Sequence, residues 1–280
     1  MKTPYISVCI CTHNRPVLFK KTLNSVINQS FRKISIIVVD DSSDEEYAVK
    51  TILECNDERI KYIRNNENQG LAYNRDLSIK NSVNADFWTF IDDDDEWHKD
   101  HLQNFVNAIT NKVGIYISHL HQNDETFSLT RAFELGITPP VGGQIYCLGL
   151  LNKYKINYGK IKTGVDHSLW IKMLKINPLM KTFSSSKINR NFHKTTMTLD
   201  ENRISNLKDS FDQWESDYVE VFGKRKFQSF KKNYLDHACY RYFVHYLKHS
   251  PNLRFCLFFR FKFLTLWLYR MVGKEFSFFN

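Results

Sequence analysis

The sequence lacks most of the features that mark secreted or membrane-spanning chains. Its 280 residues include six cysteines, without a CxxC pair and without the spacing of a metal-binding cluster. Cys9 and Cys11 fall on the same face of one expected strand, which does not suit a local disulfide, so we expect reduced thiols. The apolar segment Ile6 to Cys11 is too short for a signal peptide. No apolar run reaches the roughly 18 residues that a spanning helix needs.

The charge that is present is unevenly distributed. The formal net charge is +9 at pH 7, and residues 221–274 alone carry a net charge of +11. The rest of the chain therefore has a slight negative excess. Such an asymmetry indicates an anionic surface as the partner of the C-terminal part.

Apolar, β-favouring runs alternate with segments of helical periodicity through the first hundred residues. The runs predict strands over 6–11, 34–39, 60–63 and 87–91, and the segments between them predict helices over 17–28, 45–55 and 71–81. This order predicts an α/β fold with a mostly parallel sheet, flanked by helices and connected by right-handed crossovers. The loops after successive strands then meet at one sheet edge, where open α/β sheets bind ligands.

Five consecutive acids, Asp92 to Glu96, directly follow the fourth expected strand. Like charges at this density repel one another, so they need either a compensating cation or open water. Carboxylate oxygens at the end of a strand suit a hard divalent ion that carries phosphates. A solvated acidic turn is the alternative, and the acidic run alone favours it.

Five motifs taken together resemble the family 2 glycosyltransferases of the GT-A fold. In chain order they are SVCICTHNR, SIIVVDDSS, NQGLAYNRD, FIDDDDEW and GVDHSLW, and the resemblance covers roughly residues 5–200. It implies a Rossmann-like GT-A domain of the inverting, bacterial surface-glycan type. Such an enzyme moves a sugar from a nucleotide-diphosphate donor, usually a UDP-sugar, to a hydroxyl of a glycan or a lipid-linked acceptor.

The resemblance assigns donor-binding roles to residues in the first three motifs. Three residues after the first strand would contact the base: Thr12, His13 and Arg15. Asp41 would accept a hydrogen bond from the ring N–H of a pyrimidine, although it could equally cap the next helix. Arg75 matches the family arginine near the base and phosphates. Asp76 stands where the family usually has Asn, so the resemblance gives it no role.

Within the acid run, Trp97 sets the register of the DxD motif. Alignment on this residue makes Asp92 and Asp94 the pair, with Asp94 as the metal ligand and Asp92 reaching the ribose or a metal-bound water. Asp93 would then make a secondary contact with the donor. A slip of one residue would select Asp93 and Asp95 instead, and the sequence leaves both registers open. The implied cofactor is Mn²⁺ or Mg²⁺.

Two further residues match catalytic positions of the family. Asp166 lies where the family has the base that removes the proton of the attacking hydroxyl. An acid in the first turn of a helix also has a purely structural explanation. His193 lies where many relatives have a histidine that closes on the diphosphate or the metal, and a structural histidine is the alternative.

The sequence divides into an expected catalytic domain, residues 1–205, and a basic, aromatic helical extension, residues 206–280. The apolar stripe from Leu257 to Met271, interspersed with cations, is typical of an interfacial membrane helix. We therefore expect a cytoplasmic protein at the inner face of the plasma membrane, with homo-oligomer formation or packing on the catalytic domain as alternatives. No nucleic-acid partner is expected. A non-catalytic scaffold and a nucleotidyltransferase are the competing functions.

Overall fold

The chain forms two compact units, which are described separately. The computed structural model describes residues 3–119, 125–184, 188–190 and 203–249. One unit consists of Met1–Arg131 and Pro139–Phe192, and the other of Ala132–Thr138 and His193–Asn280. The expected domain boundary after residue 205 stays a prediction.

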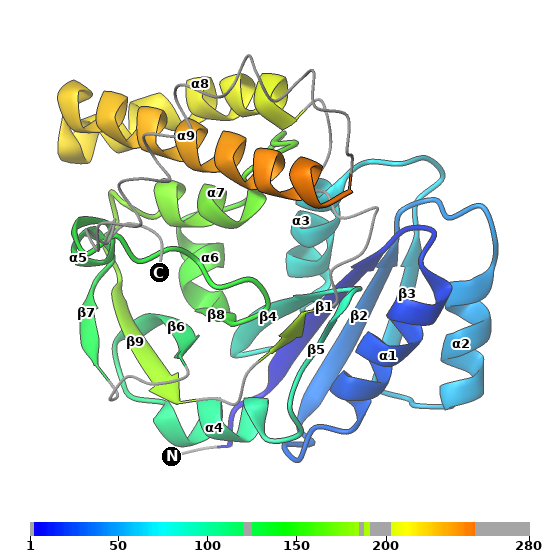
Figure 1. Cartoon of the computed structure of the whole chain (residues 1–280). Helices are drawn as coiled ribbons and strands as arrows, with labels where there is room; N and C mark the ends of the chain where they lie inside the picture. The colour runs from blue at the N-terminus through cyan, green and yellow to red at the C-terminus, as the bar shows by residue number, and fades with distance from the viewer. Residues whose placement is uncertain (1–2, 120–124, 185–187, 191–202, 250–280) are drawn as a thin grey trace. The chain divides into compact units, whose positions relative to one another are not determined.

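The first unit is built on a mixed eight-stranded sheet with the order β3-β2-β1-β4-β8-β6-β9-β7 (Figure 1). Its strands are β1 (Ile6–Thr12), β2 (Ile34–Asp40), β3 (Ile60–Arg64), β4 (Phe87–Asp92), β6 (Val113–His119), β7 (Thr126–Ser128), β8 (Gln144–Cys147) and β9 (Leu179–Ser184). A separate two-stranded sheet pairs β5 (Asp95–Glu96) with β10 (Asn189–Arg190). The predicted α/β class with a mostly parallel sheet is confirmed.

Helices cover both faces of this sheet (Figure 1). The helices of the first unit are α1 (Pro16–Ile27), α2 (Tyr47–Cys55), α3 (Leu71–Asn81), α4 (His101–Ala108), α6 (Leu148–Lys153) and α7 (Val165–Lys172), and α5 (Leu129–Glu134) leads into the second unit. Side chains of a strand alternate between faces. Ile91 of β4 joins the core formed with α1, α2 and α4. Trp88 lies on the opposite face, where its indole N–H donates to Ser78 of α3.

The four strands predicted from the first hundred residues pair in parallel, β2 and β4 flanking β1. Beyond β4 the sheet is mixed: β8 runs antiparallel to both β4 and β6, whereas β6 and β9 pair in parallel. The pairing of β4 with β8 covers Phe87 to Thr89. It therefore ends before Asp92, and the acid-bearing end of β4 projects past the β8 ladder.

The second unit contains two long helices, α8 (Arg203–Phe222) and α9 (Lys224–His249), in agreement with the helical extension predicted from residue 206. They are joined at Gly223, whose φ of 81° lies in the region that glycine adopts without strain. Aromatic side chains fill the interior, and the rings of Tyr218 and Phe230 stack with centroids 4.8 Å apart. In the described parts of the chain, no helix is long and apolar enough to cross a membrane. The apolar stripe Leu257 to Met271 lies outside them, so its membrane role stays a prediction.

Candidate active site

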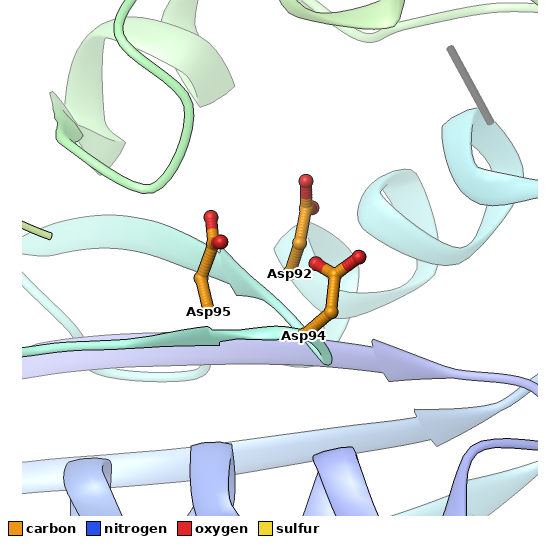
Figure 2. Close-up of side chains that lie close together, drawn as sticks. All are labelled: Asp92, Asp94 and Asp95. Atoms are coloured by element: carbon orange, nitrogen blue, oxygen red, sulfur yellow. The ribbon is translucent and has the colours of Figure 1, made fainter. Parts of the chain in front are cut away.

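The acid run forms the turn between β4 and β5. Asp92 is the last residue of β4, Asp93 and Asp94 make the turn, and Asp95 begins β5. Figure 2 shows the carboxylates of Asp92, Asp94 and Asp95 pointing to the same side of the chain, and one oxygen from each lies within 4.8 Å of the others. The turn thus brings Asp95 to the pair that the motif predicted.

Asp93, the aspartate of the run that lies outside this cluster, has different neighbours. Arg15 Nη1 and Thr12 Oγ1 each donate to its carboxylate at 2.8 Å. The side chain is almost fully buried, and this burial raises the pKa of Asp93 to about 6 although Arg15 acts in the opposite direction. The carboxylate therefore ties the loop after β1 to the turn after β4. Arg15 also lies 3.4 Å from Asp94 and so offsets part of the acid charge.

Anchors on the backbone fix the direction of β5. Thr22 Oγ1 of α1 donates to the carbonyl of Asp95 at 2.7 Å. The indole N–H of Trp97 donates to the carbonyl of Gly142 at 2.7 Å, and the ring is buried against His101. Trp97 therefore holds the chain just after the acids. These anchors stabilise the close approach of three like charges.

A buried arginine joins the acid turn to a helix that follows much later in the chain. Arg75 of α3 donates from Nη2 to Asp92 Oδ1 and from Nη1 to Asp166 Oδ1 of α7, both at 2.8 Å. Its guanidinium carbon lies 3.6 Å from the centroid of the Phe90 ring, and only 1% of its side chain is exposed. The arginine thus brings the predicted DxD and the predicted base to the same place.

The charge of Arg75 lies between those of Asp92 and Asp166. Burial acts to lower the pKa of Arg75, but the carboxylates, Asp166 foremost, raise it well above its usual range. The pKa of Asp92 is raised by burial, against the lowering effect of Arg75. The guanidinium therefore stays charged, and it offsets the repulsion between Asp92 and Asp166.

Asp166 lies in the first turn of α7, as predicted. Its Oδ1 is held by Arg75, and about a quarter of its side chain is exposed. Within the described ranges, Oδ2 has no hydrogen-bond partner. This oxygen is chemically suited to accept a proton from a bound hydroxyl. His193, the other predicted residue of this part of the chain, lies outside the described residues.

The residues predicted to contact the base lie at the carboxyl ends of β1 and β2. His13 is exposed, whereas Thr12 is buried and its hydroxyl lies 2.8 Å from that of Tyr47. Asp41 is also buried, and its carboxylate accepts hydrogen bonds from the backbone N–H groups of Gln69 and Gly70. It thereby shapes the loop that leads into α3. The N-cap position of the helix after β2 is Glu46, whose side chain makes no capping hydrogen bond, so Asp41 is not the N-cap residue.

Asp76 of α3, to which the family resemblance assigns no role, binds the backbone of a distant segment. Its two carboxylate oxygens accept from the backbone N–H groups of Tyr158 and Gly159, at 2.8 and 3.1 Å. The sequence contains one signal that position 76 is unusual: the family resemblance implies an asparagine there, and this chain has an aspartate. Asp95, which the sequence offers only in the alternative register with Asp93, lies in one cluster with Asp92 and Asp94.

Together these residues form an acidic centre beside a base-like carboxylate. The donor set of Asp92, Asp94 and Asp95 is all oxygen, which fits Mg²⁺ or Mn²⁺. The nearby Arg15 and Arg75 supply fixed positive charge. Such a centre can hold a metal-bound diphosphate on one side and receive a proton on the other.

Comparison with known proteins gives a consistent result. The family model described as "Glycosyl transferase family 2" matches residues 7–164. A Campylobacter jejuni protein named GalNAc(5)-diNAcBac-PP-undecaprenol beta-1,3-glucosyltransferase is 43% identical over 122 residues, which is 43% of this chain and 38% of the relative. The Escherichia coli UDP-Glc:alpha-D-GlcNAc-diphosphoundecaprenol beta-1,3-glucosyltransferase WfgD is 25% identical over 244 residues, covering 77% of this chain and 87% of the relative. The chain thus spans well under half of the first of these relatives.

Solved structures show the same fold. S. aureus TarS 1-349, in complex with UDP-GlcNAc, has a TM-score of 0.62 and 16% identity, and the match covers 89% of this chain and 74% of that one. The mannosyltransferase PcManGT from Pyrobaculum calidifontis, in complex with GDP-Man and Mn²⁺, has a TM-score of 0.60 and 14% identity, over 90% and 76% of the two chains. At these identities the likeness concerns the fold.

Proposed function

The chain belongs to glycosyl transferase family 2 and has the GT-A fold, and from this we propose that it transfers a sugar from a nucleotide-diphosphate donor to a lipid-linked glycan acceptor. One observation carries the proposal. A single buried guanidinium, that of Arg75, holds both Asp92 of the acid turn and Asp166 of α7. This contact supports the proposal because the proposed leaving-group site and the proposed base are thereby adjacent.

The proposed reaction is a direct displacement with inversion. Asp166 accepts the proton of the acceptor hydroxyl at Oδ2 while that hydroxyl oxygen bonds to the anomeric carbon, and the bond to the nucleotide diphosphate breaks. Arg75 keeps Oδ1 of the base in place, so the carboxylate is oriented before the acceptor arrives. No covalent intermediate with the protein is needed.

Asp94, with Asp92 and Asp95, would hold Mn²⁺ or Mg²⁺, which neutralises the charge that develops on the leaving diphosphate. His193 is proposed as an additional ligand on the basis of the family resemblance. Arg15, which lies 3.4 Å from Asp94, would also contact the donor. His13, Thr12 and Asp41 would form the base-binding part.

The nature of the substrates rests on the relatives. The names of two relatives specify an undecaprenyl diphosphate-linked acceptor, and one of them specifies UDP-Glc as donor. We therefore propose a UDP-sugar donor and a polyprenyl-diphosphate-linked acceptor, with the protein acting peripherally at the cytoplasmic face of the membrane that holds this lipid. The basic extension would supply attraction to anionic headgroups at about 1 kcal/mol for each cation near the surface.

The test is a transfer assay with the full chain, a panel of UDP-sugars, Mn²⁺ and a short polyprenyl-diphosphate-linked saccharide. The expected result is metal-dependent release of UDP and a product of inverted anomeric configuration, as read by NMR. A product of retained configuration would overturn direct displacement. Absence of heat in calorimetry with any nucleotide diphosphate would favour the non-catalytic scaffold, which the family membership does not favour.

A further inference from the structure

Two neighbouring residues of α3 reach two different parts of the site. The Arg75 side chain holds the carboxylate of Asp166, and the Asp76 side chain holds the backbone of Tyr158 and Gly159. Tyr158 and Gly159 lie in the segment just before α7, the helix that carries Asp166. One turn of α3 is therefore attached both to the predicted base and to the chain that leads to it.

The Tyr158–Gly159 segment is in turn attached to α7 itself. The carbonyl of Tyr158 accepts from Ser168 Oγ and from Lys172 Nζ, each at 3.0 Å. The N–H groups on one side of this segment thus bind α3, and the carbonyl on the other side binds α7. The segment acts as a strut between the two helices.

The strut has little freedom to move. The ring of Tyr158 is fully buried, lies 6.2 Å from that of Trp88, and has the Arg75 guanidinium 5.6 Å from its centroid. Gly159 has a φ of 74°, and a Cβ added there would lie 2.8 Å from Lys172 Nζ. The backbone conformation at residue 159 therefore favours glycine, and a larger side chain there would also displace the Lys172 ammonium group.

We propose that Asp76 is a positioning residue for glycosyl transfer, which sets the place of Asp166 by holding the Tyr158–Gly159 strut against α3. This inference rests on the proposed function and adds a residue to it. A carboxylate can accept both N–H groups, one at each oxygen. An asparagine in the same orientation would accept one N–H group at Oδ1 and would turn its NH₂ group toward the other. The observed contact, with one N–H group at each oxygen, therefore needs a carboxylate at residue 76.

The experiment compares Asp76→Asn with the wild-type chain in the transfer assay and in hydrogen exchange. We expect kcat for transfer to fall by about 10- to 100-fold, because a displacement of about 1 Å at a reacting group has an effect of this size. The donor KM should stay unchanged, since Asp76 has no contact with the acid turn. Exchange at the Tyr158 and Gly159 amides should become faster by roughly tenfold.

A second variant approaches the same strut from α7. Lys172→Met removes the bond to the Tyr158 carbonyl and should also lower kcat with donor KM unchanged. Asp86→Asn is the matched control, because Asp86 accepts the backbone N–H of Tyr5 at 2.8 Å at the far end of β4. This control should leave kcat and the amides of residues 158 and 159 as in the wild type.

The outcomes separate this inference from the proposed function. An active wild type with equal kcat in Asp76→Asn, or with unaltered exchange at residues 158 and 159, would overturn the positioning role alone. A rise in donor KM that matches the fall in kcat would indicate a general structural defect and would also overturn it. A wild-type chain without transfer to any acceptor, and without donor binding, would overturn the proposed function and the positioning role together.

Discussion

Arg75 Nη1 donates to Asp166 Oδ1 at 2.8 Å, although 91 positions separate the two residues in the sequence. This pair joins α3 to α7 beneath the site. Because the guanidinium is 1% exposed, it cannot exchange its protein partners for water without a large local opening. The position of the proposed base is therefore a property of the folded core.

The role of Asp166 can be tested by its replacement with asparagine. Asp166→Asn keeps an oxygen that accepts from Arg75, so the fold should be retained, but it removes the proton acceptor. We expect transfer to fall by about 10²- to 10⁴-fold, while calorimetric binding of UDP with Mn²⁺ is largely unchanged. Full transfer activity in this variant would show that another group is the base.

The register of the acid run makes a second prediction. Asp94→Asn and Asp95→Asn should each weaken metal-dependent UDP binding by at least about tenfold, because both side chains belong to the oxygen cluster. Asp93→Asn should leave the metal affinity in place, since the Asp93 carboxylate binds Thr12 and Arg15. The measurement is titration with Mn²⁺ at fixed UDP. A larger loss in Asp93→Asn than in Asp94→Asn would show that the other register is correct.

Removal of Arg75 should destabilise the whole unit. Arg75→Met leaves two carboxylates of restricted exposure without their shared cation, and the loss of one partner of such a pair reduces the free energy of unfolding by about 3 kcal/mol. Arg75→Lys should restore only part of the lost free energy of unfolding, because an ammonium group cannot reproduce the geometry in which one guanidinium binds two carboxylates. Urea denaturation followed by fluorescence measures both.

The control for Arg75 is the exposed cation Lys20, which pairs with Glu54 at 2.8 Å. Lys20→Met should leave the denaturation midpoint unchanged, because exposed ion pairs contribute little. Equal midpoints in Arg75→Met and wild type would contradict the stabilising role of the buried pair.

The buried His101 predicts a pH dependence of stability. Its ring stacks on Trp97 with centroids 4.6 Å apart, and burial lowers its pKa to about 3. The ordinary pKa of histidine in an unfolded chain is about 6.5, so below that pH the unfolded state binds the extra proton. The free energy of unfolding should fall as the pH drops from about 6.5 toward 3, with a contribution of up to about 1.4 kcal/mol per pH unit from this residue.

The matched variant for this prediction is His101→Phe, which keeps an aromatic ring beside Trp97 and Phe183. The carboxylates titrate in both proteins, so the difference between their stability profiles isolates the histidine. Denaturation at pH 7, 5.5 and 4.5 should show a shallower decline in the variant. Parallel profiles would mean that His101 does not carry this proton.

The sequence is sufficient to predict the helices and strands that carry the site. It is insufficient to predict which side chains of the site bind one another. The parallel strands β1 to β4 follow from apolar runs of strand length, and Asp166 was placed correctly in the first turn of α7. The direction of each carboxylate after β4 depends on the turn and on distant partners, such as Arg15 for Asp93. No local pattern records those partners. The antiparallel insertion of β8 likewise depends on the path of the chain between β6 and α6.

The place of β8 in the sheet has a consequence for synthesis on the ribosome. Strands β1 to β4 can pair as soon as they emerge, but the free edge of β4 at Phe87 to Thr89 gains its neighbour only when Gln144 to Cys147 have been translated. Until then the nascent chain presents an open edge flanked by aromatic side chains, a surface that promotes pairing between chains. Slow translation of the segment between β6 and β8 should therefore increase aggregation of this protein in the cell.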